Sequence, residues 1–374
     1  MKWYVIAGEA SGDLHGSNLL AALKKLDTHF ECRAWGGDLM AKEGAHIVKH
    51  YRELAFMGFA EVLVNIGTIL KNISFCKNDL LAHRPDAIIL IDYPGFNLRI
   101  AKFAKQNNIK VLYYISPTIW AWKKSRIHLI KAAVYKMFVI LPFEKDFYNK
   151  LGMEVDFVGH PLLDAIENYS KENISFKMFA EKNNLSDKPI VALLPGSRMQ
   201  ELNTKLPIML GVVDKFPRYQ FVIAAAPGIP LSFYNQFIRS DNVKIIENDT
   251  YGLLKQATAA LVTSGTATLE TALFDVPQVV CYIANNISYQ IAKRLIRIKY
   301  ISLVNLIMDR EVVKELIQKD LTVENLCVEL SKILPGQLKH NQIKQDYMEL
   351  TKLLGGRGAS ALTAQLMFKS IQTQ

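Results

Sequence analysis

Short apolar segments rich in β-branched and aromatic residues alternate along this chain with longer amphipathic segments. Short apolar runs of this kind are typical of buried strands, and the longer segments have the hydrophobic period of helices. The alternation therefore predicts βαβ units that build a parallel sheet with helices packed on it. Because the pattern runs twice through the chain, the fold class we expect is α/β with two doubly wound, Rossmann-like domains.

The first run of the pattern predicts strands and helices up to about residue 141. The strands are expected at Trp3–Ala7, Ala87–Asp92, Val111–Ile115 and Lys136–Leu141, and the helices near Gly12–Leu26, Glu61–Ala82 and Leu98–Asn107. The second run predicts strands at Ile190–Leu194, Gln220–Ala225, Val243–Ile246, Ala260–Thr263 and Gln278–Tyr282.

A polar segment without any strand signal separates the two runs and marks a boundary between domains. We expect a first domain over residues 1–165, a linker over 166–188 and a second domain over 189–345. Residues 346–374 are expected to form a helical tail, broken at the glycines of 355–358, that returns to the first domain. A length of 374 residues exceeds what one hydrophobic core usually serves, which agrees with two domains.

Composition narrows the class of protein. With 50% hydrophobic and 21% charged residues the chain is globular rather than disordered, and its four cysteines lack the spacing of a zinc site or a disulfide framework. It has no uncharged apolar stretch of about 18 residues and no signal-peptide pattern, so we expect a cytoplasmic protein without a membrane span. The net charge of +10 favours nucleic acid, anionic lipid or a phosphorylated substrate without choosing among them.

The ligands of open α/β sheets collect beyond the carboxyl ends of the strands, so candidate chemistry is sought there. The loop after the first strand, residues 8–16, is neither a dinucleotide fingerprint nor a P-loop. Its glycines, Gly12 among them, let backbone amides approach a ligand and Ser11 can cap the next helix, but a plain tight turn is an equal alternative. Glu9 and His15 are the candidates for chemistry, although capping or pairing with a basic residue would also account for Glu9.

A single acid, Asp92, ends a wholly apolar strand and precedes a rigid Pro-Gly turn. We predict that Asp92 is a general base, and Asn97 follows it as a further polar candidate. The alternative is that Asp92 caps the next helix or binds turn amides, as aspartate often does after strands.

Two loops in the second half suit a phosphorylated ligand. Arg198 ends the turn after one strand and brings a guanidinium to a place where a phosphate could bind, although a surface arginine is an ordinary alternative. Ser264, Gly265 and Thr266 lead from another strand into a helix whose amides and dipole would hold a diphosphate. Glu270, about one turn further, could bind ribose hydroxyls or be a solvated helix residue.

Asn305 lies inside an apolar run and needs buried partners or a ligand, and a satisfied core asparagine is an equally common explanation. No Asp-x-Asp pair occurs, so the usual carboxylate clamp for a divalent ion on a nucleotide sugar is missing. We therefore expect no metal and no other cofactor.

Several motifs occur together, in order and at matching spacing. They are residues 7–13, Ile115–Trp122, Leu141–Lys145, Leu193–Arg198, Ser264–Ala267 and Ser302–Leu306. With them the chain closely resembles the lipid-A-disaccharide synthase family. The resemblance implies a GT-B glycosyltransferase, with two Rossmann-like domains facing a central cleft, nucleotide bound mainly by the second domain and acceptor by the first.

The resemblance also implies the reaction and its location. Members join UDP-2,3-diacylglucosamine to 2,3-diacylglucosamine 1-phosphate, giving the β-1,6-linked lipid A disaccharide 1-phosphate and UDP, at the cytoplasmic face of the inner membrane of Gram-negative bacteria. It implies Asp92 as the base with Glu9 in the same essential cluster, and Arg198, Asn305 and Glu270 on the donor side. Many relatives carry an acid where this chain has Gly95, so Asp92 is the sole acid of its motif.

Acylated substrates require accessible apolar surface, and the membrane surface is an expected partner. One candidate is the helix carrying Val62, Leu63, Ile66, Ile69, Leu70 and Ile73, for which core packing is the stronger alternative. The basic amphipathic segment Ile287–Tyr300 fits an anionic lipid surface better, and Trp120–Arg126 adds aromatic and basic residues suited to headgroups. The sequence does not determine the oligomeric state, and a homodimer stays open.

Two other readings share some of these features. A UDP-N-acetylglucosamine 2-epimerase or the peptidoglycan glycosyltransferase would share the fold, but this chain lacks their acceptor-side patterns. A nucleic-acid binder would use the net charge, but the basic residues are spread through amphipathic helices rather than gathered with stacking aromatics. No nucleic-acid partner is therefore expected.

Overall fold

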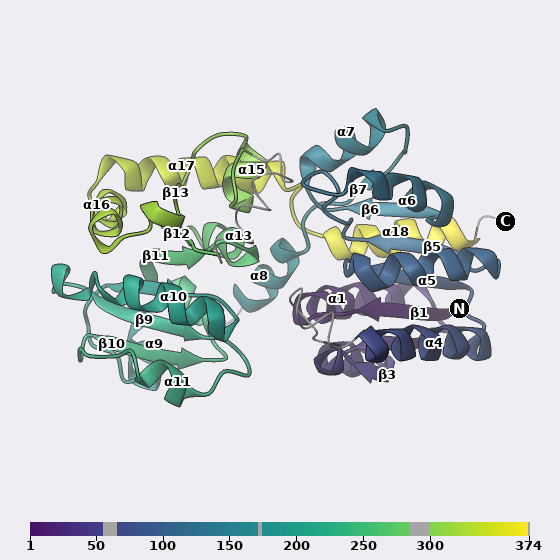
Figure 1. The fold of residues 1–374 in the computed structure, drawn as a ribbon, viewed down its shortest axis with the longest axis horizontal. Helices are drawn as coiled ribbons and strands as arrows, with labels where there is room; N and C mark the ends of the chain where they lie inside the picture. The colour runs from purple at the N-terminus through teal and green to yellow at the C-terminus, as the bar shows by residue number, and fades with distance from the viewer. Residues whose placement is uncertain (55–65, 171–173, 285–298, 373–374) are drawn as a thin grey trace. The chain divides into compact units, whose positions relative to one another are not determined.

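The structure, a computed structural model, describes residues 1–54, 66–170, 174–284 and 299–372. The chain divides into two compact units, Met1–Ala165 with Leu354–Gln374, and Ile166–Leu353. Each unit holds one parallel sheet with helices on both of its faces (Figure 1). The predicted fold class, α/β with two doubly wound sheets, is confirmed.

The first unit is built on a seven-stranded sheet in the order β3-β2-β1-β4-β5-β6-β7. Its strands are β1 (Lys2–Ala7), β2 (Glu31–Gly36), β3 (His46–His50), β4 (Ala87–Ile91), β5 (Lys110–Tyr114), β6 (Lys136–Val139) and β7 (Asp156–Phe157). Its helices are α1 (Ala10–Leu26), α2 (Asp38–Lys42), α4 (Ile66–His83), α5 (Pro94–Gln106), α6 (Ile127–Ala133), α7 (Pro142–Lys150) and α18 (Ala359–Gln372), and α8 (Leu162–Ser170) begins in it.

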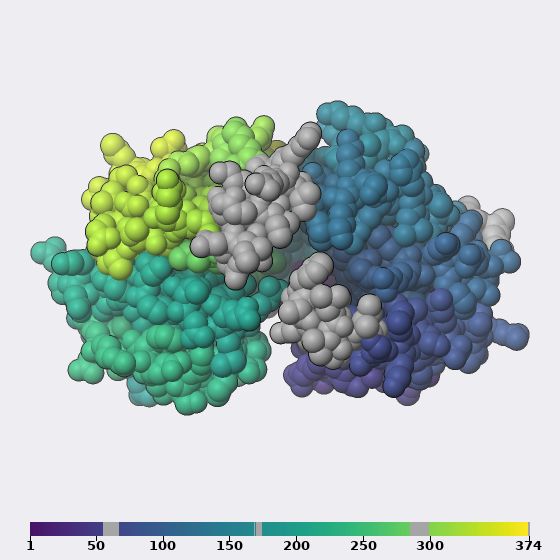
Figure 2. All heavy atoms as spheres, in the orientation of Figure 1, coloured from purple at the N-terminus to yellow at the C-terminus, as the bar shows by residue number. Residues whose placement is uncertain are grey.

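The two faces of the first sheet are covered by different helices. Leu80 of α4, Ile100 of α5 and Ile130 of α6 are fully buried in one core cluster with side chains of β4 and β5. On the other face α1 packs against α18, so the last helix of the chain completes the unit that its first strand begins. The space-filling view shows side chains filling the spaces between these ribbons (Figure 2).

The second unit holds a six-stranded sheet in the order β10-β9-β8-β11-β12-β13. Its strands are β8 (Ile190–Leu194), β9 (Gln220–Ala225), β10 (Val243–Glu247), β11 (Ala257–Thr263), β12 (Gln278–Tyr282) and β13 (Lys314–Ile317). Its helices are α9 (Phe176–Lys182), α10 (Met199–Leu210), α11 (Leu231–Asn235), α12 (Thr250–Gln256), α13 (Thr266–Leu273), α15 (Leu303–Met308), α16 (Val323–Ile333) and α17 (Leu338–Leu353). Phe179 of α9 and Leu253 of α12 belong to the core on one face, and α10 contacts α16.

The segments expected to be linker and tail have regular structure. Within 166–188, α8 continues to Ser170, and α9 contributes the buried Phe179 to the core of the second unit. In the tail, α17 belongs to the second unit and α18 to the first, with the change of unit after Leu353. The glycines at 355, 356 and 358 between these helices all have positive φ angles, a conformation that glycine adopts readily.

Candidate functional site

The two central strands of each sheet create a place for a ligand. In the first unit β1 and β4 are neighbours, with Ala7 opposite Ile91, and in the second β8 and β11 are neighbours, with Leu194 opposite Val262. From each pair the strand order runs outward in both directions, so the loops leaving the two strands diverge at their carboxyl ends. The loops of Glu9, Asp92, Arg198 and Ser264 all leave these four strands.

Asp92 is held in an uncommon backbone conformation at the end of β4. Asp92 and Tyr93 have φ angles of 43° and 47°, and such positions cost about 1–3 kcal/mol each unless their surroundings stabilise them. Two buried side chains do so, because Tyr113 donates its hydroxyl to the Asp92 carbonyl at 2.6 Å and Asn97 donates its amide to the same oxygen at 2.8 Å. Asn97, a predicted site residue, therefore lies behind Asp92 and supports its backbone.

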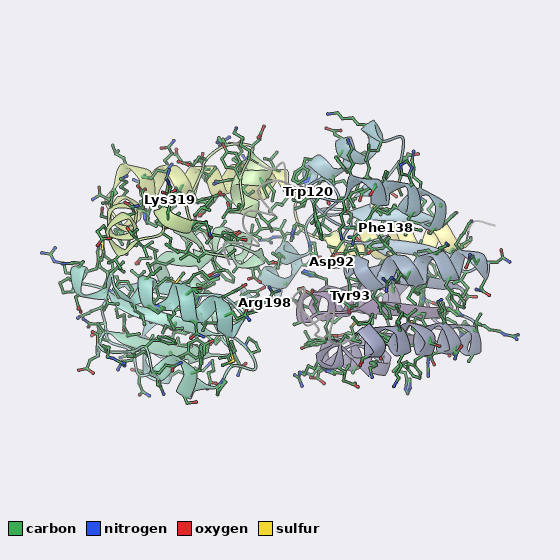
Figure 3. The ribbon with its side chains drawn as sticks, in the orientation of Figure 1. Asp92, Tyr93, Trp120, Phe138, Arg198 and Lys319 are labelled. Carbon is green, nitrogen blue, oxygen red and sulfur yellow. The ribbon has the colours of Figure 1, made fainter. Side chains whose placement is uncertain are left out.

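The Asp92 carboxyl has the acidity that a general base needs. Burial, together with the neighbouring carboxylates of Glu9 and Glu144, raises its pKa to about 7, although a hydrogen bond from the backbone N–H of Tyr93 acts in the opposite direction. The N-cap of α5 is Tyr93, so Asp92 does not cap this helix. The other part of the alternative is present, because the Asp92 carboxyl accepts a hydrogen bond from a turn amide, the N–H of Tyr93. Figure 3 labels Asp92 and its neighbour Tyr93, and Phe138 within β6.

The loop after β1 is locked to the loop after β4. A Cβ atom on Gly8 would lie 2.5 Å from the Tyr93 ring, so this ring packs where only glycine leaves room. The next residue, Glu9, is the N-cap of α1. The prediction that Ser11 caps this helix is wrong, because Ser11 is exposed within the first turn, and the buried Gly12 packs against Ala7.

Glu144 organises two motifs of the first unit, and sequence reasoning gave it no role. It is 1% exposed and accepts hydrogen bonds from the Ser116 hydroxyl, from Trp120 Nε1 at 3.2 Å and from the N–H of Leu141 at 3.0 Å. Burial raises the pKa of this carboxyl. A buried carboxylate with this many donors fixes the loop after β5 beside Asp92, and the acid in the Pro-Phe-Glu motif was the signal that could have identified it.

His15, a predicted candidate, is buried in α1 with no hydrogen-bond partner for Nδ1 among the described residues. Burial lowers the pKa of His15 to about 4, and burial together with the positive charge that His15 would carry lowers the pKa of the buried His160 to about 3. Both rings are therefore neutral in the folded protein at neutral pH. His160 accepts a hydrogen bond from the N–H of Leu162 at 3.2 Å, which indicates a structural role.

These histidines predict a loss of stability in mild acid. A pKa below the unfolded value of about 6.5 means that the unfolded chain takes up protons first, so stability falls as pH drops below about 6.5, by about 2 kcal/mol for each histidine at about pH 5. Urea unfolding at about pH 7.5 and pH 5 should show a smaller acid loss for His160→Asn, whose amide oxygen can replace Nδ1, than for the unchanged protein. The exposed His128→Asn is the control, and an equal acid loss in all three proteins would contradict this prediction.

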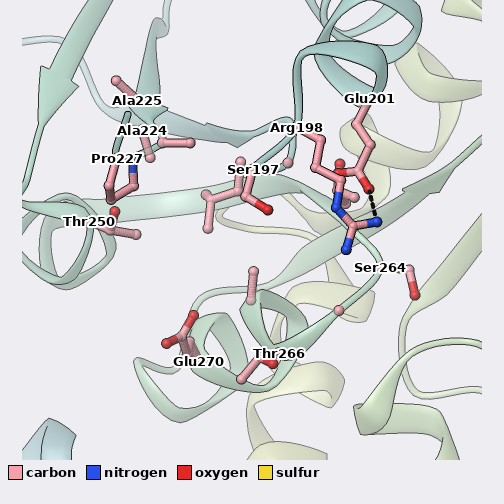
Figure 4. A pocket seen from close by; sticks show the side chains of 16 residues that line it. Ser197, Arg198, Glu201, Ala224, Ala225, Pro227, Thr250, Ser264, Thr266 and Glu270 are labelled. Atoms are coloured by element: carbon pink, nitrogen blue, oxygen red, sulfur yellow. Dashed lines mark ion pairs between the residues drawn. The ribbon is translucent and has the colours of Figure 1, made fainter. Parts of the chain in front are cut away.

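The second unit contains a pocket of about 470 Å³ at the ends of β8 and β11 (Figure 4). In Figure 4 Arg198 and Ser264 lie at one end of this pocket, whereas Ala225, Pro227 and Thr250 lie at the other. Its remaining walls come from the turn after β8, the loop after β9 and the start of α13: Leu194, Gly196, Ser197, Glu201, Ala224, Ala226, Thr263, Gly265, Thr266, Ala267 and Glu270. The structure thus brings together five residues predicted on the donor side, which are Arg198, Ser264, Gly265, Thr266 and Glu270.

Backbone geometry adapts the Arg198 end of the pocket to an anion. Gly196 and Gly265 have φ angles of 119° and 154°, which other residues rarely adopt. Gly265 is the N-cap of α13, so the first amides of this helix face the pocket with the positive end of its dipole. Arg198 is exposed, lies 3.8 Å from Glu201 and adds a guanidinium, while the Ser264 hydroxyl donates to the carbonyl of Ile301.

Glu270 is positioned rather than freely solvated. It rises from α13 and accepts a hydrogen bond at 3.0 Å from the hydroxyl of Tyr251 on α12, and burial raises the pKa of its carboxyl. Tyr251 in turn packs against Tyr169 and Phe274 at ring distances of 5.6 and 5.1 Å. Sequence reasoning missed Tyr251 and the Ala224–Pro227 loop. That loop lies at the carboxyl end of a predicted strand, where ligands of such sheets collect, so the same reasoning would have included it.

Asn305 has no capacity left for a ligand. Its Oδ1 accepts the N–H groups of Val312 and Val313 at 2.8 and 3.0 Å, and its Nδ2 donates to Val313 O and Glu315 Oε1 at 2.8 and 2.9 Å. The residue is fully buried. The prediction that Asn305 contacts the donor is therefore corrected: it fixes the loop between α15 and β13.

The candidate lipid-facing segments are only partly described. Val62, Leu63 and most of Ile287–Tyr300 lie outside the described residues, while Ile73 is buried in the first core and Leu70 is 55% exposed. In the Trp120–Arg126 segment Trp120 is held by Glu144, whereas Trp122 is 40% exposed. The Lys123 ammonium lies 4.5 Å and the Arg126 guanidinium 5.5 Å from the Trp122 ring centre.

Residues 1–54, 66–170, 174–284 and 299–372 contain neither a metal-binding cluster nor a membrane-spanning helix. No group of three His, Cys, Asp or Glu side chains in these ranges could hold a metal ion. No helix in the same ranges is long and apolar enough to cross a bilayer.

The chain is similar in sequence to one group of known proteins. The model of the family described as lipid-A-disaccharide synthetase matches residues 3–369. The lipid-A-disaccharide synthase of Syntrophus aciditrophicus is 37% identical over 375 residues, covering 98% of this chain and 97% of the relative. That of Coxiella burnetii strain Dugway 5J108-111 is 40% identical over 334 residues, or 88% of each chain.

Among solved structures the fold is shared more widely. UDP-GlcNAc 2-epimerase from Neisseria meningitidis bound to UDP-GlcNAc matches with a TM-score of 0.66 at 13% identity, covering 100% of both chains. The S. aureus MnaA–UDP structure matches with a TM-score of 0.68 at 12% identity, covering 99% of this chain and 96% of that one. At these identities the likeness shows the fold alone.

Proposed function

This chain belongs to the lipid-A-disaccharide synthetase family and is a glycosyltransferase of lipid A biosynthesis, and we propose that its two units divide the two substrates between them. The donor, UDP-2,3-diacylglucosamine, binds the pocket of the second unit. The acceptor, 2,3-diacylglucosamine 1-phosphate, binds the first unit beside Asp92. Two observations together support this proposal. A buried carboxyl with a pKa near neutrality lies at the central strands of one sheet, and a pocket suited to an anion lies at the central strands of the other.

The two ends of the pocket suit the two parts of UDP. Arg198 and the first amides of α13 provide positive charge for the diphosphate. Glu270, held by Tyr251, is a hydrogen-bond acceptor for ribose hydroxyls, and the loop carrying Ala225 and Pro227 provides a largely apolar wall for the uracil ring.

The reaction is a single displacement with inversion. Asp92 removes the proton from the acceptor 6-hydroxyl, and that oxygen forms a bond to the anomeric carbon of the donor from the face opposite UDP. The bond from this carbon to the phosphate oxygen breaks, and UDP leaves with the electron pair. Arg198 and the α13 amides stabilise the charge that grows on UDP, while Glu9 keeps the proton affinity of Asp92 high.

One assay tests the substrate assignment. The purified protein is incubated with the diacylated donor and acceptor, and mass spectrometry is used to look for UDP and a tetra-acyl disaccharide 1-phosphate. Formation of both products supports the proposal, and failure to form the disaccharide contradicts it. Incubation with UDP-N-acetylglucosamine tests the epimerase alternative, which requires the appearance of the 2-epimer.

We also place the protein at the cytoplasmic face of the inner membrane as a peripheral enzyme. Trp122 is exposed with Lys123 and Arg126 beside it, and Lys124 and Lys131 line a nearby surface pocket with Ile127 and Leu151. An amphipathic aromatic ring surrounded by cations is suited to an anionic headgroup layer. The membrane keeps both acylated substrates at this surface.

Charge reversal of Lys124 and Lys131 together to glutamate is expected to weaken binding to vesicles rich in anionic lipid by about tenfold at about 100 mM salt. The difference should vanish at about 500 mM salt, where charges are screened over a few ångströms. Vesicle co-sedimentation measures this, with Lys244→Glu on the exposed side of β10 as the control. Equal binding of both variants to anionic and neutral vesicles would contradict the electrostatic part.

A further inference from the structure

A second pocket adjoins the proposed donor pocket in the second unit. It has a volume of about 470 Å³ and shares Arg198, Glu201, Thr263 and Ser264 with the donor pocket. Its other walls are Gln200, Thr204, Lys205, Tyr282, Ile283 and Ala284. The first pocket therefore continues past Arg198 into a second space whose most unusual wall residue is Lys205.

Lys205 is a buried cation that shares its counter-ion. It is 1% exposed on α10, and Glu201 is the one carboxylate within 4.0 Å of its ammonium among the described residues. Nζ lies 3.7 Å from Glu201 Oε2, while the Arg198 guanidinium lies 3.8 Å from Oε1 of the same carboxylate. Both distances exceed those of a hydrogen bond. One carboxylate faces two cations, which leaves the boundary between the pockets positively charged.

The burial of this ammonium calls for a further partner. Burial lowers the pKa of Lys205, and Glu201 only partly opposes that effect. Burying a charge without full pairing and hydrogen bonding is costly, so a buried lysine of this kind is usually completed by another anion. An anion in the second pocket would contact Lys205 and also lie beside Arg198.

An unsatisfied hydroxyl also lies at the boundary between the two pockets. Thr263, the last residue of β11, is 6% exposed and lines both pockets. Its Oγ1 has no hydrogen-bond partner within the described part of the chain. A buried hydroxyl normally has a partner, and this one lacks it in the wall that the two pockets share.

We infer that the second pocket is the subsite for the sugar-linked phosphoryl group of the donor, with Lys205 as its cationic contact. The inference rests on the proposed donor site, in which the nucleoside and its first phosphoryl group occupy the first pocket. Arg198 lies on both pockets and can contact both phosphoryl groups. Free inorganic phosphate has the same chemistry and is the alternative occupant.

Calorimetric titration with uridine, UMP, UDP and inorganic phosphate tests this subsite. Lys205→Met removes the charge while keeping a similar apolar volume, and we expect it to weaken UDP binding about tenfold while UMP and uridine change by less than about twofold. Lys205→Arg, which keeps the charge, should retain the preference for UDP over UMP. Lys244→Met is the matched control on the same unit, with an exposed lysine that lines neither pocket.

The outcomes separate the subsite from the donor site itself. Equal weakening of UMP and UDP in Lys205→Met would overturn the subsite, because the lysine would then only maintain the shape of the pocket. An unchanged preference for UDP would overturn it as well. Phosphate that binds the unchanged protein together with UDP would identify a separate phosphate site and overturn the assignment. A protein that binds no uridine nucleotide at all would overturn the donor site together with its subsite.

Discussion

Replacing Asp92 with asparagine is expected to lower kcat by about 10²- to 10⁴-fold, the range that general bases contribute. The amide has the shape of the carboxylate but cannot accept the proton of the acceptor hydroxyl. The backbone at this position is held through its carbonyl by Tyr113 and Asn97, so the substitution should leave the loop in place. Affinity for UDP should change by less than about twofold, because we place UDP in the other unit.

The pH dependence separates a base from a merely structural carboxylate. Because burial and two neighbouring acids raise the pKa of Asp92 to about 7, the carboxyl is protonated below that pH. A protonated base is inactive, so kcat/KM should fall about tenfold for each pH unit below about 7 and level off above it. The residual activity of Asp92→Asn should lack this acid limb. Rate measurements across pH, with the exposed Asp146→Asn as control, test both points, and near-normal turnover in Asp92→Asn would contradict the assignment.

Most of the strands predicted from the sequence are strands that lie inside the two sheets. The structure gives β8, β9 and β12 the bounds that their apolar runs predict, because central parallel strands are covered on both faces. The strands β3 and β13 lie at sheet edges and carry charged residues that water can reach. They therefore lack a continuous apolar run from which a strand could be predicted. The edge strand β10 was nevertheless predicted, and the interior strand β2 was missed. The four strands whose ends form the site, β1, β4, β8 and β11, were all predicted.

Positions of the site could be predicted from the sequence, but hydrogen-bond partners could not. Ligands of open α/β sheets gather beyond the carboxyl ends of the strands, and this rule led to Asp92, Arg198 and Ser264 because each lies on a loop that follows an apolar run. Whether a polar residue faces a ligand or the protein depends on contacts made by distant segments. The side-chain amide of Asn305 makes all of its hydrogen bonds to residues 312–315. Lys205 became a candidate only because folding buries it beside Glu201. No local pattern contains that information.

The predicted helix cap at Ser11 is a second case in which the sequence did not determine a local contact, and the observed cap lies two residues earlier. Ser, Thr, Asp and Asn are the usual N-cap residues, and Ser11 has the favoured side chain. In the structure the helix begins at Ala10, so the extended cap position falls on Glu9. A sequence pattern determines the ends of a helix less well than its middle. Here the cap position falls two residues before Ser11, on Glu9, and the Glu9 carboxylate raises the pKa of Asp92.

Replacing Arg198 with methionine is expected to lower kcat/KM by about 10²- to 10³-fold, as the loss of one preorganised charge donor at a leaving group does. The guanidinium lines both pockets of the second unit, so it can contact both phosphoryl groups of the proposed donor. The Arg198 side chain is exposed. Arg198 is the N-cap residue of α10, but its side chain makes no capping hydrogen bond, so removing the guanidinium should not unfold the helix. Arg218→Met, at an exposed position of the same unit, is the control.

The division of this loss between binding and turnover tests the role of Arg198. Negative charge on UDP increases as its bond to the sugar breaks, so the guanidinium should stabilise the transition state more than the bound donor. UDP affinity should therefore fall by less than kcat/KM does, and uridine affinity should not change. Arg198→Lys should recover only part of the rate, because an ammonium lacks the two-pronged contact of a guanidinium. If Arg198→Met weakens uridine as much as UDP, the residue shapes the pocket and the assignment to the leaving group is wrong.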